Sequence, residues 1–137
     1  MKRRVLLDTG PLVALLNRSD RYHAWAAEQW TCADAPLLSC EAVVAEACHL
    51  LRSCPGGGAA VVELVRRGAI ALPFSLAEES AAVTRMLVRY ADVPMSLADA
   101  CLVRMAETLG CPVMTIDADF RVYRIHGRRV IPTRMPA

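Results

Sequence analysis

The chain has 137 residues, a length that fits one compact domain, and we predict a single domain over residues 1–137. Hydrophobic residues make up 55% of it and charged residues 22%, which excludes an intrinsically disordered chain. The net charge of +2 is too small to attract nucleic acid by overall charge alone. No apolar run approaches the roughly 20 residues of a transmembrane helix, so we expect a cytoplasmic protein without membrane contact.

The first half of the chain alternates short apolar segments with helical ones. Residues 3–8 predict a buried strand, and a helix follows from Gly10 to about Asn17, with Pro11 near its start. Asp20 is expected to cap a second helix that reaches about Thr31. The further expectations are a strand at 36–39, helices at 41–53 and 59–67, and a strand at 69–73.

The second half continues the alternation. Ser75 is expected to cap a helix toward Tyr90, and Ser96 a helix that ends at Leu109 before Gly110. A strand at 111–116, a turn or short helix at 117–123 and a last strand at 129–131 complete the pattern. Strands that alternate with helices predict an α/β fold whose parallel sheet is covered on both faces.

Two aspartates stand at the ends of predicted strands. Asp8 follows the first strand, and Asp117 follows the strand at 111–116. In open parallel sheets, ligands bind in the crevice beyond the carboxyl ends of the strands, so both side chains should face that crevice. An Asp in such a place can also be a turn former or a helix cap, and each of the two alone leaves both readings open.

Two further acids lie at the margins of apolar helix faces. Glu46 borders the apolar arc of its helix, where a glutamate can also extend to water. Asp99 follows Ser96 by three residues, a spacing that resembles a capping box, and it also lies at the edge of an apolar stripe. An acid in the first turn is stabilised by the helix dipole and could serve both roles.

If these four acids converge to about 5 Å, each ionised pair repels by roughly 3 kcal/mol at an effective dielectric near 20. Protons, arginine or a divalent metal could offset that repulsion. A site made only of carboxylates suits Mg²⁺ or Mn²⁺, whereas Zn²⁺ more usually brings His or Cys. The coincidence of four such acids in one small domain therefore favours a functional site.

Three other features of the sequence carry weaker signals. The motif DTG at Asp8 also occurs in aspartic proteases, but those need an all-β fold, which the helical periodicity here argues against. The six cysteines show no metal-binding spacing, and we expect reduced, buried thiols. No acid follows Asp119, whereas five arginines do, so Arg121 and Arg124 are candidates for phosphate contacts or belong to a solvated basic tail.

With these residues in view, the sequence resembles the PIN-domain nucleases, and most closely the VapC-type toxins of bacterial toxin–antitoxin pairs. The resemblance covers nearly the whole chain. It rests on four segments in this order: LLDTGPLVALLNRSDRYHAWA, SCEAVVAEACHLL, SLADACLVRMAETLG and TIDADF. Each is weak alone, but their order and separations are specific.

The resemblance implies a three-layer α/β/α sandwich with a central, mainly parallel sheet. It also implies endonucleolytic cleavage of RNA with Mg²⁺ or Mn²⁺, leaving a 5′-phosphate and a 3′-hydroxyl. Relatives commonly form homodimers and are inhibited by a small antitoxin protein. By the match, the residues implied at the site are Asp8, Glu46, Asp99 and Asp117 for catalysis and metal, Asp119 as a frequent fifth acid, and Thr9, Ser96 and Thr115 as supporting hydroxyls.

Two alternatives remain open on the sequence. A PIN nuclease could process RNA as a housekeeping enzyme instead of acting as a toxin. The chain could also be a catalytically inactive RNA-binding module, although the presence of all four acids argues against that.

Overall fold

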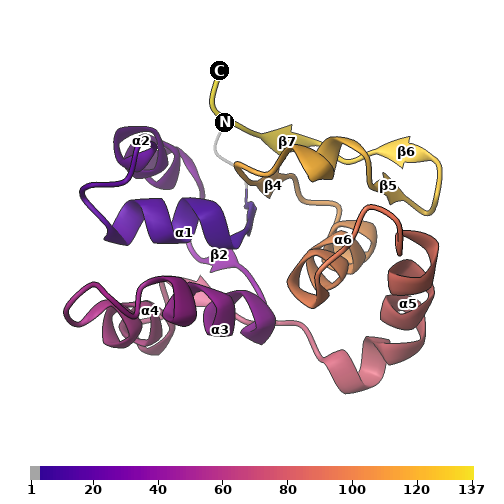
Figure 1. The fold of residues 1–137 in the computed structure, drawn as a ribbon, viewed down its shortest axis with the longest axis horizontal. Helices are drawn as coiled ribbons and strands as arrows, with labels where there is room; N and C mark the ends of the chain where they lie inside the picture. The colour runs from indigo at the N-terminus through magenta and orange to yellow at the C-terminus, as the bar shows by residue number, and fades with distance from the viewer. Residues whose placement is uncertain (1–3) are drawn as a thin grey trace.

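The computed structural model describes residues 4–137, in which strands and helices alternate along the chain (Figure 1). The helices are α1 (Thr9–Leu16), α2 (His23–Cys32), α3 (Glu41–Leu50), α4 (Gly57–Arg66), α5 (Leu76–Arg89), α6 (Leu97–Leu109) and the short 3-10 helix η1 (Ala118–Arg121). The strands are β1 (Leu6–Leu7), β2 (Leu37–Leu38), β3 (Ile70–Ala71), β4 (Val113–Met114), β5 (Arg124–Ile125), β6 (Arg129–Val130) and β7 (Thr133–Arg134).

The central sheet has five strands in the order β3-β2-β1-β4-β7, and every pairing in it is parallel. β1 lies in the middle, where Leu6 is in register with Leu38 of β2 and with Val113 of β4. Helices α1, α2 and α4 lie on one side of the strands, and α5 and α6 on the other (Figure 1). The three-layer α/β/α sandwich expected from the sequence is therefore confirmed.

The capping signals of the second half are also confirmed. The side chain of Ser75 accepts a hydrogen bond from Glu78 N at the start of α5. At the start of α6, Ser96 and Asp99 form the complete capping box, because each side chain bonds the backbone N–H of the other. Gly110 ends α6 in the left-handed conformation with φ 69°, which glycine adopts without strain.

Some predicted boundaries are wrong. Helix α2 begins at His23 instead of after Asp20, because the Asp20 side chain accepts from Tyr22 N and closes a turn first. Helix α3 ends at Leu50 instead of 53. The segment at 129–131 is not a strand of the main sheet: its β6 pairs antiparallel with β5, and β7 at Thr133 supplies the edge strand.

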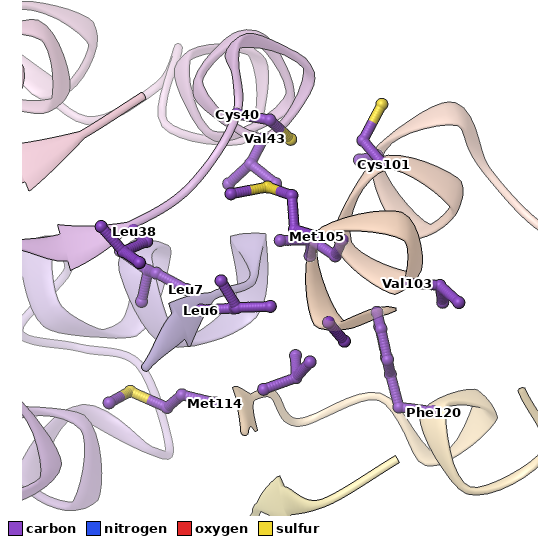
Figure 2. Close-up of a cluster of buried hydrophobic side chains, with 14 of the residues drawn as sticks. Leu6, Leu7, Leu38, Cys40, Val43, Cys101, Val103, Met105, Met114 and Phe120 are labelled. Carbon is purple, nitrogen blue, oxygen red and sulfur yellow. The ribbon is translucent and has the colours of Figure 1, made fainter. Parts of the chain in front are cut away.

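The core forms between the central strands and the helices packed against them, among them α3 and α6. Figure 2 shows Leu6 and Leu7 of β1 among Val43 of α3, Met105 of α6 and Met114 of β4. All five side chains are at most 1% exposed, and burying each one stabilises the fold by about 1.5–3 kcal/mol. This packing holds the carboxyl ends of β1 and β4 and the first turn of α6 in fixed positions.

All six cysteines are free thiols, as expected, but they are not all buried. Cys40 and Cys101 are buried, Cys32 is exposed, and the other three are half-buried. Among residues 4–137, no helix is both long enough and apolar enough to cross a membrane.

Candidate active site

The strand order reverses direction at the centre of the sheet. From β1 the chain proceeds to β2 and β3 on one side, and it later returns to β4 and β7 on the other. At such a reversal the connecting segments diverge and leave a crevice beyond the carboxyl ends of the two central strands. Asp8 follows β1 directly, and Asp117 follows β4 after two intervening residues, so both lie at this crevice.

A pocket of about 300 Å³ occupies the crevice. Four acids from four separate segments line it: Asp8, Glu46, Asp99 and Asp117. The other lining residues are Thr9, Gly10, Leu50 and Ile116. The structure thus brings together all four acids that the sequence singled out.

Asp8 is the most constrained of these acids and is only 6% exposed. Its Oδ1 accepts from the backbone N–H of Thr9 at 2.8 Å and so caps α1. Its Oδ2 accepts from the hydroxyl of Thr115 at 2.7 Å. The residues Asp-Thr-Gly therefore begin a helix after a parallel strand, and the fold is not the all-β one of an aspartic protease.

Asp99 is held on one of its two oxygens. Oδ2 accepts from the hydroxyl of Tyr123 at 2.9 Å and from Ser96 N at 3.3 Å. No hydrogen bond within residues 4–137 uses Oδ1. One carboxylate thus caps α6 and also presents an oxygen to the pocket, the two roles that the sequence left open.

Glu46 and Asp117 are exposed acids at the rim of the pocket. Glu46 projects from α3, and its Oε2 accepts from the Thr9 hydroxyl at 3.3 Å. Asp117 Oδ1 accepts from Asp119 N at 2.9 Å, while Asp117 N donates to the Thr115 hydroxyl at 2.9 Å. The Thr115 hydroxyl therefore connects the two strand-end acids, because it also bonds Asp8.

The electrostatics of the pocket disfavour charge on the buried acids. Burial raises the pKa of Asp8 to about 6, although its bonds from Thr115 and Thr9 act against the shift, and Asp99 and Asp117 add repulsion. Burial also raises the pKa of Asp99, against its bonds from Tyr123 and Ser96. None of the ion pairs found in the described part of the chain involves the four pocket acids.

The remaining residues predicted for the site lie around the pocket and do not line it. Ser96 and Thr115 act from behind through Asp99 and Asp8, and half-buried Asp119 offers its backbone N–H to Asp117. Arg121 is exposed on η1, whereas Arg124 lines a different cavity between α5 and α6.

Tyr123 is the residue that sequence reasoning missed. Its ring is completely buried, and it contacts the rings of Tyr90 and Phe120 edge to face. Only tertiary packing brings its hydroxyl to Asp99, so the basic segment around it gave no local signal.

The donor chemistry of the pocket fits a hard divalent cation, since four carboxylates offer only oxygen ligands and lack a cationic partner. Their present arrangement is not a closed coordination site. Within residues 4–137, no three His, Cys, Asp or Glu side chains are placed so that they could hold an ion as they stand.

Comparisons with known proteins point to one family. A family model described as the PIN domain matches residues 5–125. Among solved structures, the chain is similar to Mycobacterium tuberculosis VapC20, described as a sarcin–ricin loop cleaving toxin. The two share 22% identity with a TM-score of 0.80, over 91% of this chain and 98% of the other, which supports the fold. No curated protein sequence is significantly similar. Since the family model spans most of its length, the chain belongs to the PIN-domain family.

Proposed function

We propose that the protein is a single-domain endoribonuclease that uses Mg²⁺ or Mn²⁺ to cleave RNA phosphodiester bonds. One observation carries the proposal: four carboxylates from segments far apart in the chain line one pocket at the reversal point of the sheet. Mutual repulsion of these acids costs stability unless a cation joins them. Because the repulsion among the four carboxylates destabilises the fold, the pocket favours a ligand of high positive charge.

Asp8, Asp99 and Asp117 are our candidates for holding the cation, directly or through water, and Asp119 supports them through Asp117. When bound, such a cation stabilises the charge that develops on the scissile phosphate and lowers the pKa of water. Asp8 is fixed on both oxygens, so it contributes a rigid anchor. Asp99 contributes Oδ1, because its Oδ2 is occupied by Tyr123 and Ser96.

Glu46 is our candidate for orienting the attacking water or for a second cation. Its Oε2 accepts a hydrogen bond from the Thr9 hydroxyl, so Thr9 sets the orientation of the carboxylate. Its Oε1 can then accept a proton of water. Attack in line with the leaving group would give a 5′-phosphate and a 3′-hydroxyl. Arg121 and Arg124, which follow the last acids, are proposed contacts to RNA phosphates.

We further propose that the enzyme is a cytoplasmic toxin that forms a homodimer and is inhibited by a small antitoxin protein. The likeness to VapC20, described as a toxin, supports this reading over a housekeeping nuclease. Growth of a bacterial host should stop when the protein is induced and continue when the Asp8→Asn variant is induced. Unchanged growth with an active enzyme would favour the housekeeping alternative.

The ribonuclease proposal is tested by incubating purified, folded protein with total RNA in Mg²⁺, in Mn²⁺ or in excess chelator. We expect cleavage only with a divalent cation, with the cut sites mapped by sequencing. Asp8→Asn should abolish it, while the matched control Asp92→Asn, an exposed acid outside the pocket, should retain it. Folded protein that binds RNA but never cleaves it would instead indicate an inactive binding module.

A further inference from the structure

A second and larger cavity, of about 510 Å³, lies between α5, α6 and the β5–β6 hairpin. Four arginines line it, Arg85, Arg89, Arg104 and Arg124, together with His126. Glu107 is the only acid that lines it, and none of the four acids of the candidate active site takes part. The cavity is therefore a separate and positively charged feature of the described chain.

One wall of this arginine cavity is neutralised within the protein. Arg104 Nε donates to Glu79 at 2.7 Å, and its Nη1 donates to Glu107 at 3.2 Å. The same Glu107 accepts from His126 N at 2.6 Å. This wall ties α6 to α5 and to the hairpin, and it leaves the other arginines to set the charge of the cavity.

Arg89 is held in place by neutral groups. Its Nη2 donates to the carbonyl of Gly127 at 3.2 Å, and its Cζ lies 5.8 Å from the centre of the Tyr90 ring. Gly127 has φ 71°, and a Cβ atom added there would collide with the guanidinium group. The hairpin thus makes room for Arg89 and contacts it through a carbonyl, which does not cancel its charge.

Arg124 is held in the same way from the opposite side. Its Nη1 donates to the carbonyls of Arg121, Val122 and Tyr123 at 2.6, 3.0 and 3.1 Å. Arg85 lies one turn before Arg89 on α5, so like charges are stacked on one helix face. Among residues 4–137, no carboxylate lies within ion-pair distance of Arg85, Arg89 or Arg124.

We propose that the arginine cavity is a second RNA-binding site, which holds a backbone phosphate of the substrate. It lies outside the pocket lined by the four acids, hereafter the cutting pocket. This inference rests on the proposed function for the identity of its ligand. Guanidinium groups without a carboxylate partner match the geometry of a phosphate group, to which they can donate two parallel hydrogen bonds. The exposed Arg128 and Arg129 extend the positive surface along the hairpin.

The cavity and the cutting pocket share a boundary. The ring of Tyr90 lines the arginine cavity and lies 5.1 Å, centre to centre, from the ring of Tyr123. Tyr123 in turn bonds Asp99, which lines the cutting pocket. Two tyrosine rings thus lie between the two sites.

The test measures binding of a labelled single-stranded RNA, long enough to cover both sites, by fluorescence anisotropy in excess chelator. Arg85→Gln/Arg89→Gln should raise Kd about tenfold and reduce the slope of log K against log salt by about 0.7 for one lost phosphate contact. Arg52→Gln/Arg67→Gln is the matched control. It removes two exposed arginines at the α3–α4 end, and Arg52, like Arg89, donates to a backbone carbonyl. This control should leave both quantities unchanged.

An equal effect of the two double variants would overturn the proposal, because it would indicate only general attraction between charges. Arg85→Gln alone provides a second measurement, since its side chain makes no hydrogen bond in the part of the chain described and its loss should not affect folding.

Inorganic phosphate and a mononucleotide are tested separately by thermal shift. Tight binding of either to wild type alone, with unchanged RNA affinity in the double variant, would assign the cavity to a free phosphate compound. Because binding is measured without metal, these outcomes are independent of whether the protein cleaves RNA.

Discussion

The hydroxyl group of Tyr123 donates a hydrogen bond of 2.9 Å to Oδ2 of Asp99, from a ring that is completely buried. The partner of this bond is an acid of the candidate active site, whose charge is disfavoured by burial. A buried phenol that bonds a buried carboxylate both orients it and favours its ionised form. The pKa of Tyr123 itself is raised, first by its burial and then by the neighbouring charge of Asp99.

Tyr123→Phe should lower kcat/KM for RNA cleavage by about tenfold, because the Asp99 carboxylate loses the contact that orients it. The free energy of unfolding should fall by about 1.5–3 kcal/mol, the cost of removing a hydrogen bond to a charged group. Tyr22→Phe is the control. It also removes a tyrosine hydroxyl, but from a residue that lines neither the pocket nor the arginine cavity. Equal activity of the two variants would contradict a positioning role for Tyr123.

Ser96→Ala should reduce both stability and cleavage, since Ser96 caps α6 and bonds the residue that lines the pocket. Loss of a serine cap costs about 1 kcal/mol. Ser75→Ala removes the equivalent cap of α5, which lies away from the pocket acids. Urea unfolding should show similar losses for both variants, whereas cleavage assays should show a loss only for Ser96→Ala. A similar loss of cleavage in both would indicate an effect of stability alone.

The pH dependence of stability should report the burial of Asp8. Its pKa is raised to about 6 in the folded protein, so the unfolded chain ionises this group at lower pH than the folded one. The contribution of protonated Asp8 to the free energy of unfolding is present in full below about pH 4. It is lost as the pH rises through about 6. The difference between the two pKa values corresponds to about 3 kcal/mol.

Urea unfolding in excess chelator checks this relation. The stability of Asp8→Asn relative to wild type should rise by about 3 kcal/mol between about pH 4 and pH 8, because asparagine does not ionise. A relative stability that does not change with pH would mean that Asp8 keeps an ordinary pKa. A large loss of stability at every pH would indicate a structural role for Asp8.

Mn²⁺ or Mg²⁺ should stabilise the wild-type protein against thermal unfolding. Binding to the folded state alone adds about 2.7 kcal/mol when the free ion is at about 100 times its Kd. Asp8→Asn should lose most of this gain, and Asp92→Asn should retain it. Sodium chloride at equal ionic strength serves as the reference, and an equal gain in both variants would place the ion elsewhere.

Helices with local capping signals were predictable from the sequence, and tertiary features were not. Ser75, Ser96 and Gly110 bond the backbone next to them, so the sequence alone places the ends of α5 and α6. β7 went unpredicted because Thr133 and Arg134 carry no apolar signal and form a strand only by pairing with β4. The start of α2 was misplaced because a turn at Asp20 has the same local signal as a cap.

The same distinction holds for the candidate site. The strand-end position of Asp8 and Asp117 and the helix-face position of Glu46 and Asp99 are visible in the sequence, and the structure brings these residues to one pocket. The supporting bonds depend on contacts across the fold, such as that of Tyr123 with Asp99. Patterns of local spacing cannot reveal such contacts. The catalytic roles of these acids remain predictions, which the variants above test.

The hydrogen bond from Thr115 to Asp8 joins positions 107 residues apart in the chain. During synthesis on the ribosome, Asp8 emerges well before β4 and Tyr123. A nascent chain therefore cannot assemble the pocket, since β1 has no neighbour on that side and Asp99 has no phenol to orient it. The order of translation itself therefore delays the formation of the acidic pocket until β4 and Tyr123 have left the ribosome.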